Sequence, residues 1–289
     1  MMQASRSSLL DTSKGITMAE SDMQKAEKIV AELKDIFKAT FSKNRITYGP
    51  KVGNDVRLVI VPDGKLKELQ LEESSRLADL TLRWALMLAP EVVRDILGRK
   101  YRTLKETFPY PYINERTIQI LTREDRAIIR GQILQSIISG MLQDIGTTVA
   151  AYYSEATDQI FIQKSDIDAG TLAHEMAHAY ANIHWYQFVF VMGTRKMKDT
   201  DKLDEGMAIH IAQTVIESWY NRHPEGTYPD TGSGYDKSYT DRADAFIKAV
   251  NKDNAFTAFF GGYCNYTGAK PEDSLIIGKK KKKWKWAWR

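Results

Sequence analysis

The chain has 289 residues, of which 43% are apolar and 27% charged, the composition of an ordinary globular protein. This length suits one large domain or two lobes around a cleft. A single cysteine, Cys264, excludes an internal disulfide framework. No apolar run approaches the length of a membrane span, and the N-terminus lacks the apolar core of a secretory signal. These features fit a cytoplasmic protein or one exported by a dedicated secretion route.

The net charge of +4 is unevenly distributed along the chain. The last eleven residues, KKKKKWKWAWR at 279–289, carry seven positive charges, so the remainder sums to −3. Cations interleaved with tryptophans are typical of segments that adsorb to anionic membranes, lipopolysaccharide or nucleic acid. The alternatives are a solvated tail or an engineered addition to the natural sequence.

Composition and periodicity divide the chain into four segments. They are a disordered lead-in at 1–24, an N-terminal α/β lobe of unknown role at 25–121, a second folded region at 122–278, and the basic, Trp-rich tail at 279–289. Within the lobe, apolar periodicity predicts helices at 25–41, 72–88 and 91–99. A buried strand is predicted at 55–65, where a Pro-Asp-Gly turn ends it.

The second region begins with a predicted helix at 123–145. Thr122 and Asp125 have the spacing of a capping box, Gly146 supplies a stop, and paired apolar residues predict a wide buried face. Residues 147–163 follow as a hairpin around a polar turn at 154–158. Further helices are predicted across 171–180, 201–220 and the stretch that contains Ala243, Phe246, Ile247 and Val250.

The stretch TLAHEMAHAY, residues 171–180, contains two histidines in the pattern H-E-x-x-H. Residues four apart on a helix lie about 40° apart around its axis, so His174 and His178 can bind one ion. Glu175 stands beside them, where it can take a proton from a water that the metal activates. The alternative is a buried amphipathic helix with two incidental histidines. Because the whole chain has only five histidines, an H-E-x-x-H pattern is improbable by chance, and the metal interpretation is the stronger one.

TLAHEMAHAY resembles the extended helix signature of the zincin metallopeptidases at every position from Thr171 to Tyr180. The preceding hairpin is similar to the strand pair before that helix in zincins. The resemblance implies an α+β zincin-like fold, mostly helical, with a small antiparallel sheet beside the active-site helix. It also implies that 122–278 is a catalytic region holding one Zn²⁺ per chain, and that the edge strand holds substrate backbone by strand addition.

The third metal ligand has two candidates, of which the first is His184. This residue falls at the third histidine of the metzincin pattern H-E-x-x-H-x-x-G-x-x-H, in which the glycine ends the helix. Here Ala181 replaces that glycine, and apolar residues after it favour a continued helix. A continued helix would place His184 about 280° around the axis from His174, pointing away from the ion.

The second candidate is Glu205, in the predicted helix 201–220. It lies on the apolar stripe of that helix, and a buried carboxylate needs a partner, which the metal would supply. The stretch Glu-Gly-x-Ala resembles the third-ligand helix of gluzincins, with Gly206 allowing close approach of another helix. We therefore favour His174, His178 and Glu205 as the ligand set. Asp204 could orient a ligand, but an ordinary first-turn aspartate is the simpler interpretation.

The resemblance to gluzincin-like families also implies a tyrosine that steadies the oxyanion, just before a helix. Tyr239 fits best and Tyr235 is second, although either could simply pack in the loop. Together these residues predict a zinc metallopeptidase acting on a protein or peptide, which would suit a delivered toxin or effector. The alternatives are a zinc amidase or endopeptidase acting on peptidoglycan stem peptides, and a non-catalytic zinc protein whose cationic tail binds anionic surfaces.

Overall fold

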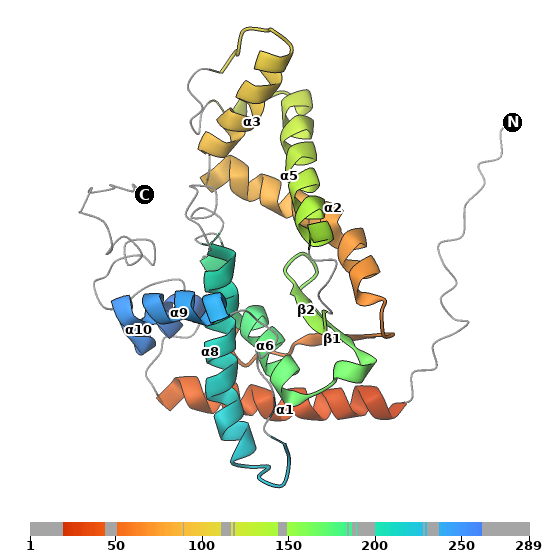
Figure 1. The fold of residues 1–289 in the computed structure, drawn as a ribbon, viewed down its shortest axis with the longest axis vertical. Helices are drawn as coiled ribbons and strands as arrows, with labels where there is room; N and C mark the ends of the chain where they lie inside the picture. The colour runs from red at the N-terminus through yellow and green to blue at the C-terminus, as the bar shows by residue number, and fades with distance from the viewer. Residues whose placement is uncertain are drawn as a thin grey trace, which may run out of the picture.

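The protein is described by a computed structural model, whose fold is drawn in Figure 1. It describes residues 20–43, 51–88, 90–110, 117, 119–143, 149–183, 185–186, 189, 200–227, 229 and 237–261. The basic tail, His184, Tyr235 and Gly146 lie outside these residues. None of the helices among the described residues is long and apolar enough to cross a membrane.

A small three-stranded sheet lies beside the motif helix (Figure 1). Strands β2 (Ala151–Ser154) and β3 (Gln159–Gln163) form the predicted hairpin, while β1 (Arg57–Val61) joins the other side of β3. β1 and β3 run parallel and β2 and β3 antiparallel, so the expectation of a purely antiparallel sheet was wrong. The reason is the long helical connection between β1 and the hairpin, because a crossover of that length allows parallel pairing.

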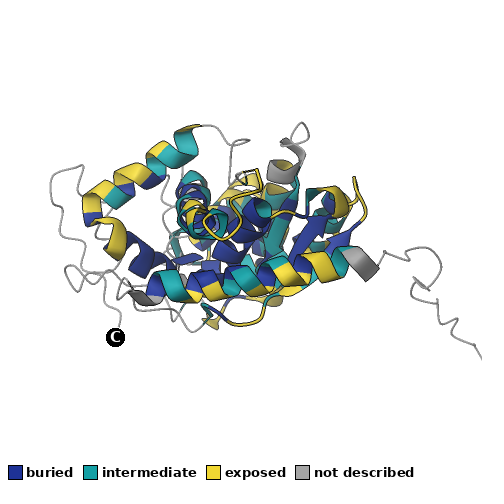
Figure 2. Cartoon of the chain, turned by 90° about the horizontal axis from the view of Figure 1, so that it is seen from below, coloured by how far each residue is buried: buried dark blue, intermediate teal, exposed yellow. Residues whose placement is uncertain are grey.

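The motif helix is α6 (Ala169–Tyr180). It shares the main core with four other helices and the sheet: α1 (Glu20–Lys43), α8 (Thr200–Tyr220), α9 (Lys237–Val250) and α10 (Lys252–Gly261). A short 3₁₀ turn at Lys164–Asp166 connects β3 to α6. α1 starts earlier than the expected Lys25, and it runs along the base of the molecule in Figure 1. Seen from below in Figure 2, buried and exposed residues alternate along α1. Its apolar stripe, which includes Leu33, Ile36 and Phe37, is fully buried against α6 and α8.

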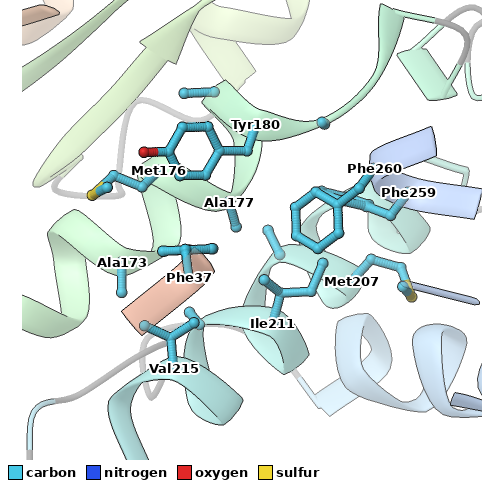
Figure 3. Packing of buried hydrophobic residues seen from close by; sticks show 14 of the residues in the cluster. Phe37, Ala173, Met176, Ala177, Tyr180, Met207, Ile211, Val215, Phe259 and Phe260 are labelled. Carbon is cyan, nitrogen blue, oxygen red and sulfur yellow. The ribbon is translucent and has the colours of Figure 1, made fainter. Parts of the chain in front are cut away.

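The main hydrophobic core lies where α6 and α8 cross. Every residue of α6 except Thr171 is buried, including His174, Glu175 and His178 of the motif. Figure 3 shows residues of this core from α6, among them Ala173, Ala177 and Tyr180, and from α8, among them Met207 and Ile211. The edge of the Tyr180 ring meets Phe37 of α1, with 5.1 Å between the ring centroids. The metal motif therefore sits on a helix that the core holds in place.

The helices α2 (Leu66–Leu88), α3 (Pro90–Thr103) and α5 (Arg123–Gln143) form an arm above the sheet (Figure 1). They share a second core, and the predicted capping box opens α5, where the Asp125 backbone N–H donates to Thr122 Oγ1 at 3.1 Å. Among the apolar side chains of α5 whose burial is described, Ile129 and Ile133 are buried, while Ile128, Leu134 and Ile137 are partly buried, so the expected buried face is narrower there. The packing explains this, because the main contacts of α5 are with α2 and α3.

The predicted division of the chain at residue 121 stays a prediction. β1 and α1 come from the first half but pack with elements of the second half, in one sheet and one core.

Candidate metal centre

The motif helix α6 begins and ends at defined backbone features. Asp168 caps its start, because its Oδ1 accepts from the backbone N–H groups of Gly170 (2.7 Å) and Thr171 (3.0 Å). The helix ends at Tyr180, and Ala181 is extended at φ −58° and ψ 142°. The expected continuation of the helix past Ala181 was therefore wrong. The next residue, Asn182, leaves the helix and donates its N–H to the Phe259 carbonyl at 2.9 Å, so packing against α10 redirects the chain.

Three ligand atoms from two helices converge above α6. His174 Nε2 lies 3.3 Å from His178 Nε2 and 3.2 Å from Glu205 Oε2, and the distance from His178 Nε2 to Glu205 Oε2 is 3.5 Å. His174 and His178 are buried on α6, while the Glu205 side chain, on α8, is 33% exposed. Among the described residues, this is the one group of three or more His, Cys, Asp or Glu side chains whose ligand atoms are close enough to hold a metal ion.

Glu175 is buried beside the two histidines. Burial raises the pKa of its carboxyl, while His174, His178 and a hydrogen bond from the Tyr153 backbone N–H partly offset the effect. Tyr153 belongs to β2, the edge strand of the sheet. The edge strand therefore lies directly against the candidate base, a contact that sequence reasoning did not assign to Tyr153.

Asp204 orients His178 from behind. Its Oδ2 lies 3.5 Å from His178 Nδ1, and its Oδ1 accepts a hydrogen bond of 2.6 Å from Trp185 Nε1. Trp185 is fully buried, so the carboxylate is held from a fixed point in the core. The simpler interpretation of Asp204, as an ordinary first-turn aspartate, was therefore wrong. Its partners lie far away in the sequence, which is why its position alone did not indicate this contact.

The charges within the group favour a protonated His178 and an ionised Glu205. Burial would lower the pKa of His178, but the carboxylates of Glu205 and Asp204 outweigh it and hold that pKa well above its usual value. Burial would likewise raise the pKa of Glu205, but His178 and His174 hold it well below its usual value. The carboxylate of Glu205 is thus ionised, as a metal ligand must be.

Two further polar residues near the group were missed from the sequence. Tyr186 is buried, and its hydroxyl donates to the His178 backbone carbonyl at 2.6 Å. Glu155, in the turn after β2, is close enough that Asp204 helps burial to raise its pKa to about 8. Neither residue belongs to a recognisable motif. The signal available in the sequence was the position of Glu155 at the end of the predicted edge strand.

Tyr239 lies in the first turn of α9, where Lys202 Nζ stands 5.6 Å from the centre of its ring. A Cβ on Gly206 would collide with the Tyr239 carbonyl oxygen, so this glycine permits the close crossing of α8 and α9 that its position predicted. The other two described histidines face carboxylates of other helices. His210 Nε2 is 3.0 Å from Asp244, and His223 Nε2 is 2.8 Å from Glu32.

The donor set fits a borderline metal such as zinc. Two imidazole nitrogens and one carboxylate oxygen are the ligand types of catalytic zinc sites, in which a fourth position stays open for water or substrate. All three ligand atoms lie within 4.8 Å of one another. The exposed side of Glu205 shows where the site meets solvent.

Comparisons of this chain with models of protein families, with curated proteins and with solved structures give no match.

Proposed function

We propose that this chain is a zinc-dependent metallopeptidase that hydrolyses peptide bonds in a protein or peptide. The observation that carries the proposal is the convergence of His174, His178 and Glu205 beside the buried carboxyl of Glu175. The gluzincin-like arrangement of the motif and of Glu205-Gly206 supports the same conclusion. One zinc ion per chain would be held by these three ligands.

Zinc bound there would supply Lewis acidity, which lowers the pKa of a water and polarises the carbonyl of the scissile bond. Glu175 would take one proton from the attacking water as its oxygen bonds to the carbonyl carbon. When the carbon–nitrogen bond breaks, Glu175 would pass that proton to the departing amine. The products are a carboxylic acid and an amine. The raised pKa of Glu175 suits a group that must hold a proton between these two steps.

The edge strand β2 offers a place for the substrate backbone. β3 pairs with one side of β2, and among the described strands none pairs with its other side. The Tyr153 N–H on this strand donates to Glu175, so a peptide added beside β2 would pass close to the base. This arrangement supports an extended peptide as the substrate.

Metal content tests the ligand set. The purified full-length chain should contain one zinc by elemental analysis, and Glu205→Ala should lose it because one of three ligands is removed. His223→Ala is the matched control, since His223 faces Glu32 and lies outside the group. Zinc retained in Glu205→Ala but lost in His184→Ala would contradict the proposed ligands.

Hydrolysis tests the base. Glu175→Gln keeps the shape of the side chain but cannot take a proton, so hydrolysis should fall by about a hundredfold or more while zinc content stays the same. Glu225→Gln, on an exposed loop, is the control. Full activity in Glu175→Gln would remove this mechanism. Turnover of purified peptidoglycan but not of unfolded protein would move the substrate to cell-wall stem peptides.

We propose Tyr239 as the group that stabilises the oxyanion, on the family resemblance and its place at the start of α9. Loss of such a donor costs about a hundredfold in kcat. Tyr239→Phe should therefore lower kcat with little change in zinc content. An unchanged kcat would leave Tyr239 as a packing residue.

A further inference from the structure

Glu155 carries a buried carboxylate oxygen that accepts no hydrogen bond from the described residues. The residue follows the last residue of β2 and is half-buried, and its Oε2 is buried with no hydrogen-bond partner among the described residues. Its charge acts on Asp204 and His178, which places it at the edge of the candidate metal centre. Buried polar groups are almost always paired, so an unpaired one at a site calls for a specific explanation.

The other three carboxylates of the centre all have partners, which sets Glu155 apart. The partners are Tyr153 N–H for Glu175, Trp185 Nε1–H for Asp204, and the imidazoles of His174 and His178 for Glu205.

The two cations whose charges act on Glu155 do not fill the gap. His178 lowers the pKa of Glu155 more than Lys51 does, but its imidazole faces the carboxylates of Asp204 and Glu205. Lys51 Nζ is bound to Tyr153 Oη at 3.2 Å and to Asp158 Oδ1 at 3.1 Å. Tyr153 Oη in turn donates to Asp158 at 2.6 Å, so these three groups are held by one another. Glu155 is therefore a fourth carboxyl group near a site for one divalent ion.

We propose that Glu155 binds a cationic ammonium group of the substrate, either a lysine side chain or a free α-amine, close to the scissile bond. The proposal rests on the proposed peptidase function. Glu155 lies two residues beyond Tyr153, in the turn that follows β2, so at most about 7 Å separates the two along the chain. A peptide paired with β2 would therefore bring a residue within about two positions of the scissile bond to Glu155.

The chemistry of the carboxyl agrees with a cation as the missing partner. Without one, burial raises the pKa of Glu155 to about 8, so at neutral pH the group is mostly protonated. An ammonium would favour the ionised form and form a charge-assisted hydrogen bond with it.

Peptide binding to the zinc-loaded, full-length Glu175→Gln protein tests this proposal without turnover. One lysine is moved through an otherwise neutral peptide, each peptide is paired with its norleucine counterpart, and one pair differs by acetylation of the N-terminus. We expect one lysine position, or the free amine, to bind about tenfold more tightly than its neutral counterpart. The lysine and acetylation pairs distinguish the two sources of the ammonium.

The added Glu155→Gln substitution should abolish this preference, whereas Glu225→Gln on the exposed loop should leave it intact. Glu155→Lys should reverse it, favouring a peptide with glutamate at the same position. The reversal keeps the test valid if Glu155→Gln folds poorly. Equal binding of lysine and norleucine peptides, or a preference that survives Glu155→Gln, would overturn the proposal.

The same peptides separate the two hypotheses. If zinc-loaded wild type binds cationic peptides through Glu155 but cleaves none of them, the peptidase function fails and the cation site stands. If it cleaves lysine and norleucine peptides equally well, the peptidase stands and the cation site fails.

Discussion

Replacing Asp204 by asparagine isolates its effect on the metal ligand His178. The amide oxygen of asparagine can still accept the hydrogen bond from Trp185 Nε1, which is 2.6 Å long. The amide NH₂ would instead face His178 Nδ1, at the position where the carboxylate oxygen now lies 3.5 Å away. The substitution therefore removes the negative charge behind the imidazole and keeps the contact to the core.

The expected loss of zinc affinity follows from what is known of carboxylates that orient a metal-bound histidine. Removing a group that orients a metal-bound histidine weakens metal binding about tenfold to a hundredfold, which is about 1.4 to 2.8 kcal/mol. Asp204→Ala should show the same loss of zinc affinity and a further loss of stability. In that variant the buried Trp185 N–H loses this acceptor, and an unsatisfied buried donor costs about 1 to 3 kcal/mol.

Competition with a chromophoric chelator measures zinc affinity, and urea unfolding of the metal-free protein measures stability. Asp204→Asn should change the first and hardly the second, while Asp204→Ala should change both. The exposed Asp253→Asn, on α10, is the control and should change neither. Wild-type zinc affinity in Asp204→Asn would refute the assignment of Asp204 to the metal centre.

Three further outcomes are expected. Gly206→Ala should destabilise the protein by about 1 to 3 kcal/mol in urea unfolding. The new Cβ would meet the Tyr239 backbone and lie 2.9 Å from Ala243 Cβ. Gly131→Ala is the control and should not destabilise the protein, because a Cβ there would meet nothing within 4 Å. In the metal-free protein, Glu155 holds its proton up to a pKa of about 8, but the unfolded chain loses that proton near 4.5. The free energy of unfolding should therefore fall by about 1.4 kcal/mol per pH unit as pH rises between these values. Glu155→Gln should remove this slope, and an unchanged slope would exclude Glu155 as its source. Deleting residues 279–289 should leave hydrolysis of a small soluble substrate unchanged but weaken salt-sensitive co-sedimentation with anionic vesicles, and equal binding by both forms would exclude a role for the tail.

Local periodicity was enough to predict most helices, the hairpin and the residues that converge at the centre. His174 and His178 follow from a spacing of four on one helix, and Glu205 from its place on an apolar stripe. The capping box of Thr122 and Asp125 is also a local pattern. Each of these inferences concerns residues within a few turns of one another, where helix geometry alone fixes their relation.

The missed features depend on contacts between distant segments. Asp204 meets Trp185 and His178 only because α6 ends at Tyr180 and the chain then turns back. The parallel pairing of β1 depends on the path of the helical arm between β1 and β2, which strand periodicity does not report. Glu155 reads as an ordinary turn residue until the fold places it near Asp204.

The candidate metal centre brings several carboxylates together in a buried place, where charged groups need compensating charges. Four carboxylates, those of Glu155, Glu175, Asp204 and Glu205, act on one another or on the two histidines at a place where burial disfavours charge. Without a metal, protons must compensate, as the raised pKa values of Glu155, Glu175 and His178 indicate. A divalent ion would replace those protons, so metal binding should release protons and stabilise the contact between α6 and α8 together. Negative charge that costs stability without a metal would then be the feature that selects a metal and, as we propose for Glu155, a cationic substrate.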